Sequence, residues 1–187
     1  MEAELTAIKE TLRAKSNEKA KTAFQKFVPT SQRVYGVRVP ALNELAREYR
    51  NGSFELAEAL WNSGAFEERL LAAKILGRVC KKDPERMLRL VNKFAGDISD
   101  WAVCDTLGMQ SLKDIALLKQ TEIFCLSTRF VKSKSAWKRR LAVVLLTHFV
   151  KEKQSRARIV EILKQVRDDK EHYVKKAVEW LERDLKE

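Results

Sequence analysis

The stretch Trp101-Ala102-Val103-Cys104-Asp105 sets the register of this chain, because the same register recurs downstream with charged residues in the matching place. A step of 35 residues leads from Asp105 to Arg140, and a second step leads to Lys175. One step back from Asp105 lies Leu70. Helix pairs that repeat at about this period would place all four positions along one side of a stack. The sequence therefore predicts a carboxylate that faces a row of cations, with the tryptophan of the stretch on the same helical face.

The composition favours long helices. The 187 residues are 45% hydrophobic and 34% charged, with only 6 Gly and 3 Pro, which is unlike a sandwich of short strands. No apolar run approaches the roughly 20 residues of a membrane span. The start, Met1-Glu2-Ala3-Glu4, lacks the basic and apolar parts of a signal peptide. We expect one soluble domain over residues 1–187, monomeric, in a bacterial or archaeal cytosol and associated with the nucleoid.

The charge of the chain points to a polyanion as its partner. The formal net charge is +11, and residues 131–187 hold 16 Lys and Arg against 9 Asp and Glu. A nucleic-acid backbone is the commonest partner of such a surface, although a merely solvated basic surface is the alternative. The three cysteines and two histidines lack metal-type spacing, so we expect buried thiols, no metal and no cofactor. These residues are Cys80, Cys104, Cys125, His148 and His172.

Helix signals follow one another along the chain. Residues 1–52 read as an N-terminal helical cap, with helices over 2–14 and 17–27, an extended crossing over 35–40, and a helix that ends at Asn51-Gly52. Residues 53–187 read as helix-pair repeats. Their helices are expected to start at Ser53, about 67, Asp83-Pro84, Ser99-Asp100, 115, Ser135 and 155, and the last carries residues 173–181. The expected fold class is all-α, a right-handed α-solenoid of HEAT-like repeats with a concave basic face.

The chemistry of Asp105 is restricted by what the sequence lacks. There is no phosphate-binding glycine loop, no HExxH zinc motif, no nucleophile elbow and no second carboxylate obviously paired with it. Cleavage of an N-glycosidic bond needs fewer groups when the leaving base is already a cation, because no general acid is required. A fixed carboxylate can stabilise the oxocarbenium-like sugar and orient a water, and aromatic faces can hold the cationic sugar.

Four motifs together resemble the AlkD-type DNA alkylation repair enzymes. They are Trp101 with Asp105, the run Trp137-Lys138-Arg139-Arg140, the run Lys176-Ala177-Val178-Glu179-Trp180, and the entry Gly36-Val37-Arg38-Val39-Pro40. The resemblance covers about residue 17 to the end. It implies a HEAT-like-repeat DNA glycosylase that removes positively charged N3- or N7-alkylated purines from double-stranded DNA, in base excision repair, without a metal or organic cofactor.

The resemblance also implies roles for individual residues. Asp105 would be the catalytic carboxylate, Arg140 would hold the DNA backbone and organise the site, and Trp101 and Trp180 would flank the deoxyribose of the lesion. The expected DNA-binding residues are Phe27, Trp137, Lys138, Arg139, Lys175 and Lys176. The Arg140 guanidinium can bind phosphate with a rigid fork, and lysines add softer contacts.

Two positions depart from that family, and they keep alternatives open. Phe27 stands where the best-studied type has a tyrosine near the lesion, and Ala102 stands where an acidic residue often follows the tryptophan. One alternative is a non-catalytic relative that binds bent, branched or damaged DNA. Another is a scaffold for protein interactions, as many HEAT-like stacks are. Asp105 argues against a pure DNA binder, because a carboxylate in a DNA channel repels phosphate.

Overall fold

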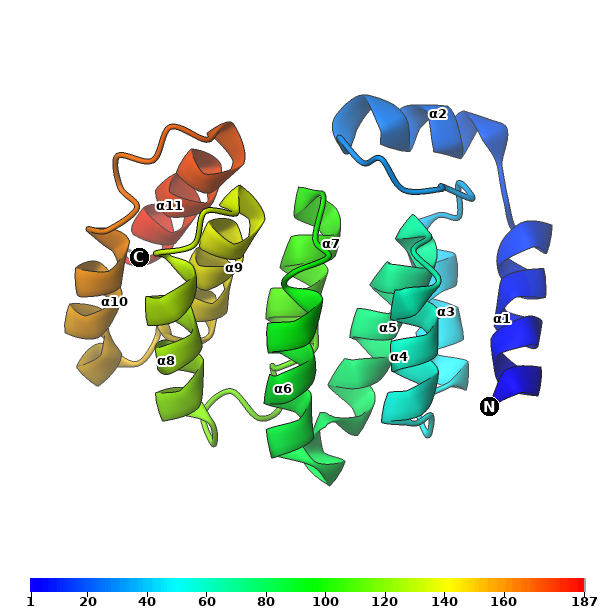
Figure 1. Ribbon diagram of the computed structural model, residues 1–187, viewed down its shortest axis with the longest axis horizontal. Helices are drawn as coiled ribbons and strands as arrows, with labels where there is room; N and C mark the ends of the chain where they lie inside the picture. The colour runs from blue at the N-terminus through cyan, green and yellow to red at the C-terminus, as the bar shows by residue number, and fades with distance from the viewer. Residues whose placement is uncertain (187) are drawn as a thin grey trace.

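The computed structural model describes residues 1–186, and all regular elements in this range are helical. The helices stand side by side in a row, except that α2 lies across one end of the others (Figure 1). The α-helices are α1 (Glu2–Ala14), α2 (Glu18–Phe27), α3 (Val39–Glu48), α4 (Phe54–Asn62), α5 (Phe66–Val79), α6 (Pro84–Phe94), α7 (Trp101–Asp105), α8 (Gln120–Phe130), α9 (Ala136–Leu146), α10 (Arg156–Leu163) and α11 (His172–Asp184). Four short helices are η1 (Cys80–Lys82), η2 (Thr106–Gln110), η3 (Thr147–Phe149) and η4 (Lys153–Ser155).

Every second helix packs against the next to form a layer. Helix α3 contacts α5, α5 contacts α7, α7 contacts α9, and α9 contacts α11. We call α3, α5, α7, α9 and α11 the α3–α11 layer. The helices between them pack on this layer, most extensively α4 on α5 and α8 on α9. The buried apolar side chains form one connected cluster that runs from Ile8 to Leu181.

Side-chain caps explain where several helices begin. Asn17, Ser53, Asp83, Asp100 and Ser135 each accept a hydrogen bond from a backbone N–H three residues later. Such a cap satisfies one of the N–H groups that the first turn leaves without a partner. The starts predicted at residues 53, 83, 100 and 135 are therefore confirmed.

The helices after residue 100 differ from the prediction in three places. Helix α7 is only five residues long and continues as the π-helix η2. Helix α8 begins at Gln120 rather than at 115, because residues 111–119 form turns that bury Ile115 and Ala116 without a helix. Helix α10 begins at Arg156, after the short helix η4, rather than at 155. Residues 111–119 have apolar spacing like that of a helix but form turns, and periodicity alone does not distinguish the two.

A buried carboxylate fixes the connection between α2 and α3. Glu67 of α5 is fully buried and accepts hydrogen bonds from the backbone N–H groups of Tyr35 at 2.9 Å, Gly36 at 2.7 Å and Val37 at 3.0 Å. Gly36 has φ +84°, and a Cβ there would collide with the carbonyl oxygen of Asn17. Only glycine fits such a left-handed, close-packed position. The extended crossing predicted over 35–40 is thus anchored on α5.

The cysteine prediction was wrong at one position. Cys80 and Cys104 are buried and Cys125 is exposed, and all three are free thiols. Cys125 lies on the surface of α8 in a groove with Glu122 and Arg129, because the apolar stripe of that helix passes through Ile123, Phe124 and Leu126 instead. None of the helices in residues 1–186 is long and apolar enough to cross a membrane.

Candidate active site

Asp105 occupies the last position of α7, directly before the π-helix η2. We call this single wide helical turn, Thr106–Gln110, the π-turn. Two glycines make the backbone around this turn close-packed. A Cβ on Gly108 would lie 2.6 Å from Cγ1 of Val144 on α9, and a Cβ on Gly77 of α5 would collide with the carbonyl oxygen of Gln110. The π-turn is therefore closely packed between α5 and α9. Such turns inside helices are frequent at functional sites.

The structure brings Asp105 and Arg140 together, as the 35-residue step predicted. Nε of Arg140 donates to Oδ1 of Asp105 at 2.9 Å, and Nη2 donates to Oδ2 at 2.7 Å. Nη1 of Arg140 donates to the backbone carbonyl of Tyr173 on α11. The fork of the guanidinium thereby fixes the plane of the carboxylate and links α7, α9 and α11.

The Asp105 carboxylate remains reachable from solvent. Its side chain is 20% exposed, against 7% for that of Arg140. Each carboxylate oxygen can accept two hydrogen bonds, and Arg140 uses one on each. One acceptor position per oxygen is therefore left for a ligand or a water.

Burial and pairing act on this carboxyl in opposite directions. Burial raises the pKa of Asp105 above its ordinary value, and the hydrogen bonds and charge of Arg140 reduce that rise without cancelling it. The carboxylate in turn raises the pKa of Arg140, although burial of the guanidinium acts in the opposite direction. Asp105 is thus an ion-paired carboxylate that is somewhat more basic than a free one, which suits a group that accepts a proton from water.

Trp101, one helical turn before Asp105, contacts a segment that is distant in the sequence. Nε1 of Trp101 donates to the backbone carbonyl of Phe27 at 3.0 Å, which ties α7 to the end of α2. Phe27 is 75% exposed, an unusual state for a large apolar residue. A cavity of about 390 Å³ lies under α2, with both rings in its wall. Lys19, Ala20, Ala23, Phe24, Phe27, Val28, Arg38 and Trp101 line it.

The other predicted residues of α9 and α11 differ in their contacts and in their exposure. The ring of Trp137 packs on that of Tyr173 with centroids 5.3 Å apart, next to the carbonyl that Arg140 binds. Lys175 and Lys176 are exposed on α11, while Lys138 and Trp180 are half-buried. Within residues 1–186, no hydrogen bond or ring contact joins Trp180 to Trp101 or Asp105.

Arg139, which the sequence predicts to contact DNA, makes hydrogen bonds inside the protein. Its Nε and Nη2 donate to the two carboxylate oxygens of Asp169 at 2.6 and 3.2 Å, and Nη1 donates to the carbonyls of Ser133 and Lys134. Burial opposes ionisation of Asp169, but the hydrogen bonds from Arg139 outweigh it and lower the pKa of that carboxyl. With four hydrogen bonds inside the protein, Arg139 ties the start of α9 to the segment before α11.

The sequence analysis missed Tyr173 as a member of the site. Its carbonyl accepts from Arg140 and its ring packs on Trp137. The 35-residue step contained the signal, because it leads from Lys138 to this residue. Among the described residues, no group of three or more His, Cys, Asp and Glu could hold a metal ion.

Comparison with known proteins identifies the family of this chain. The search of curated proteins found no match. A family model described as DNA alkylation repair enzyme matches residues 8–186, nearly the whole chain. The paired carboxylate and arginine, the exposed aromatic ring and the basic charge thus stand on a chain that belongs to the DNA alkylation repair enzyme family.

Proposed function

We propose that this protein is a monofunctional DNA glycosylase that excises positively charged N3- or N7-alkylated purines from duplex DNA. The observation that carries the proposal is the Asp105 carboxylate, held in one plane by Arg140 and still 20% exposed. Family membership supports repair of alkylated DNA. The excision chemistry and the lesion class are inferred from the site.

The reaction needs only one ionised group from the protein. The bond between C1′ and the purine nitrogen breaks with its electron pair going to the base, which leaves neutral because it started as a cation. The sugar becomes an oxocarbenium-like cation, which the Asp105 carboxylate stabilises across a partly buried, low-dielectric gap. A water then bonds to C1′, and its proton passes to the carboxylate and on to solvent.

Arg140 has two tasks in this mechanism. It keeps the carboxylate ionised and oriented through the two hydrogen bonds at 2.9 and 2.7 Å. Its charge also offsets the repulsion between Asp105 and the phosphates on either side of the lesion. A carboxylate without this partner would weaken DNA binding.

Aromatic and basic side chains supply the remaining contacts. The indole of Trp101, which donates to the backbone carbonyl of Phe27 at 3.0 Å, and the exposed side chain of Phe27 offer aromatic faces to the cationic sugar or base. We assign Trp180 to the far side of the sugar, and Lys138, Lys175 and Lys176 to phosphates. The α3–α11 layer would then be the concave basic face of a right-handed HEAT-like stack that holds the duplex.

The experiment that tests the proposal compares cationic with neutral leaving bases. Duplexes that each carry one N7-methylguanine, one N3-methyladenine or one uracil are incubated with excess protein, and free base is measured. We expect release of the two methylated purines and none of uracil, because the site offers no general acid for a neutral base. Equal release of uracil would contradict the mechanism. Duplex binding without any release would instead favour the non-catalytic relative.

A further inference from the structure

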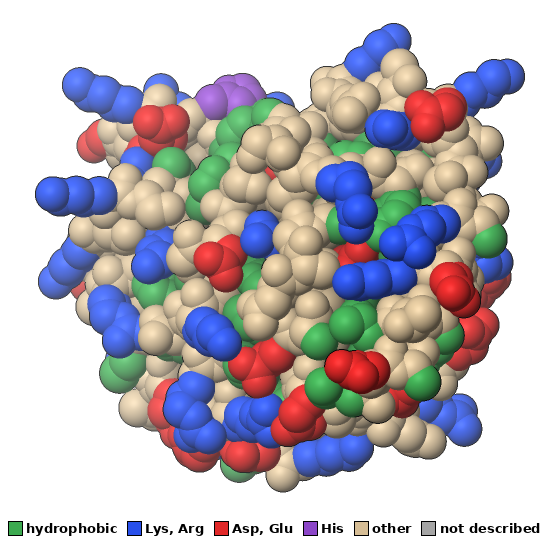
Figure 2. Space-filling model, turned by 45° about the vertical axis from the view of Figure 1, so that its right-hand side comes forward, with side chains coloured by type: hydrophobic (Ala, Val, Ile, Leu, Met, Phe, Trp, Pro, Cys, Tyr) green, Lys and Arg blue, Asp and Glu red, His purple; other side chains and the backbone are tan. Residues whose placement is uncertain are grey.

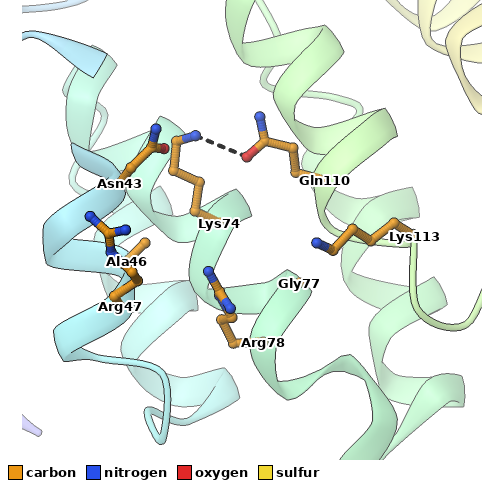
Figure 3. A pocket seen from close by; sticks show the side chains of 8 residues that line it. All are labelled: Asn43, Ala46, Arg47, Lys74, Gly77, Arg78, Gln110 and Lys113. Atoms are coloured by element: carbon orange, nitrogen blue, oxygen red, sulfur yellow. Dashed lines mark hydrogen bonds between the residues drawn. The ribbon is translucent and has the colours of Figure 1, made fainter. Parts of the chain in front are cut away.

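A second site candidate is a cavity of about 310 Å³ between α3, α5 and the turn after η2. Its wall carries four cationic side chains and no carboxylate. Figure 3 shows them arriving from three segments: Arg47 from α3, Lys74 and Arg78 from α5, and Lys113 from the turn after η2. Asn43, Ala46, Gly77 and Gln110 complete the lining.

These four cations lack the ion pairs that other cations of this protein have. Arg86, for example, contacts Glu55 and Glu58, and Lys119 contacts Glu85 and Glu122. Across residues 1–186, no salt bridge involves any of the four side chains in the cavity wall. Figure 2 shows Lys and Arg spread over one face of the molecule, with much of the acidic surface nearer its lower edge. Like charges around one cavity repel each other unless an anion joins them.

Lys74 is the most enclosed of the four. It is half-buried, and burial together with the nearby Arg78 charge lowers its pKa. Its Nζ donates to Oε1 of Gln110 at 2.9 Å, a neutral acceptor that leaves the ammonium charge uncompensated (Figure 3). The ammonium group of Lys74 therefore lies at the cavity wall, and its positive charge remains available to an anionic ligand.

The chemistry of the wall restricts the ligand to a small polar anion. Apart from Ala46 and Gly77, every lining residue is cationic or carries a side-chain amide. No aromatic ring is present for a base to stack on, and the volume is at the lower end of ligand pockets. Two guanidinium forks, two ammonium groups and two amides match the oxygens of a phosphate group.

The cavity lies on the layer that carries the candidate active site. Gln110 ends the π-turn that begins directly after Asp105, and α5 packs against both α7 and η2. One wide helical turn therefore separates the carboxylate from the cavity, along the same segment. A duplex bound across the α3–α11 layer at Asp105 would therefore lie over α5, which carries two of the four cations.

We propose that Arg47, Lys74, Arg78 and Lys113 bind a phosphate group of the DNA backbone, away from the lesion. The inference rests on the proposed function only in taking DNA as the ligand. Free phosphate has the same chemistry, and the test separates the two sources. A contact of this kind strengthens binding to any sequence, damaged or not, and takes no part in breaking the glycosidic bond.

The test measures dissociation constants for undamaged duplex DNA over a range of NaCl concentrations. The site variant is Arg78→Gln with Lys113→Gln, two exposed positions whose loss leaves the Lys74–Gln110 bond in place. The control variant is Lys151→Gln with Lys153→Gln, which removes the same charge from exposed residues that do not line the cavity. Thermal unfolding of each variant checks the fold, and a second arm measures whether inorganic phosphate raises the unfolding temperature.

We expect the site variant to bind about 10-fold more weakly at low salt, and its salt slope to fall by about 1 to 2 relative to the control, since each lost phosphate contact reduces the slope by about 0.9. Equal slopes and affinities for the two variants would overturn the proposal. So would unchanged duplex binding with inorganic phosphate stabilising only the natural protein, which would assign the cavity to free phosphate. Because no base release is measured, failure of the glycosylase proposal leaves this result intact.

Discussion

Replacing Glu67 by glutamine tests how the N-terminal segment is held against the rest of the molecule. In the natural protein, Oε1 accepts from the N–H groups of Gly36 and Val37, and Oε2 accepts from that of Tyr35. A glutamine keeps one oxygen for the first two but presents an NH₂ group to the third. A donor then faces a donor in a fully buried place.

The magnitude follows from these three bonds. One buried N–H without an acceptor costs about 1–3 kcal/mol, and the other two bonds lose the strength that a charged acceptor gives. We therefore expect Glu67→Gln to lower the free energy of unfolding by about 3 kcal/mol. For a protein of this size, about 1 kcal/mol shifts the melting temperature by about 2–4 °C, so the expected drop is about 6–12 °C.

Thermal unfolding followed by circular dichroism measures this drop. Glu44→Gln is the matched control, because Glu44 is exposed and is expected to change the melting temperature by less than about 2 °C. A Glu67→Gln protein that melts within that same margin of the natural protein would refute the reasoning. The connection would then be held by something other than this carboxylate.

Three further perturbations have defined outcomes. Gly108→Ala forces a methyl group against Val144, so we expect about 1–3 kcal/mol of destabilisation in urea unfolding, and an unchanged midpoint would argue against the close packing of the π-turn. Asp169→Asn removes the charged partner of Arg139 and should cost about 2 kcal/mol in the same assay, whereas a neutral result would return that arginine to the candidate DNA contacts. Burial and the Glu68 acceptor raise the pKa of Tyr35 to about 12, so the neutral phenol is favoured in the folded state. Stability present below about pH 10 is then lost as the pH rises towards about 12, by up to about 3 kcal/mol, and Tyr35→Phe should remove this loss.

Local chemistry made many helix boundaries predictable from the sequence. A capping side chain such as that of Ser53 or Asp83 accepts a hydrogen bond from an N–H three residues later, so a short stretch of sequence is enough to predict it. The pairing of Asp105 with Arg140 was predictable for a similar reason. A repeat period converts a separation of 35 residues into adjacency, and the structure places the two side chains within hydrogen-bonding distance.

The features that escaped prediction depend on contacts between distant segments. Close packing at Gly77 and Gly108 holds the π-turn after Asp105, and no local sequence motif predicts such packing. Arg139 and Arg140 are neighbours in sequence, yet helical rotation of about 100° per residue turns one to Asp169 and the other to Asp105. The basic cavity combines side chains from three segments, and no local sequence motif brings them together.

The most direct test of the central claim is single-turnover release of N7-methylguanine from duplex DNA by the natural protein and by Asp105→Asn. Both are compared at saturating protein, with Asp168→Asn as an exposed carboxylate control. We expect the Asp105 variant to bind the duplex at least as well and to release base at least about 100-fold more slowly, and the control to match the natural protein. Release by the Asp105 variant at the natural rate would contradict the account, because the carboxylate would then have no part in breaking the bond.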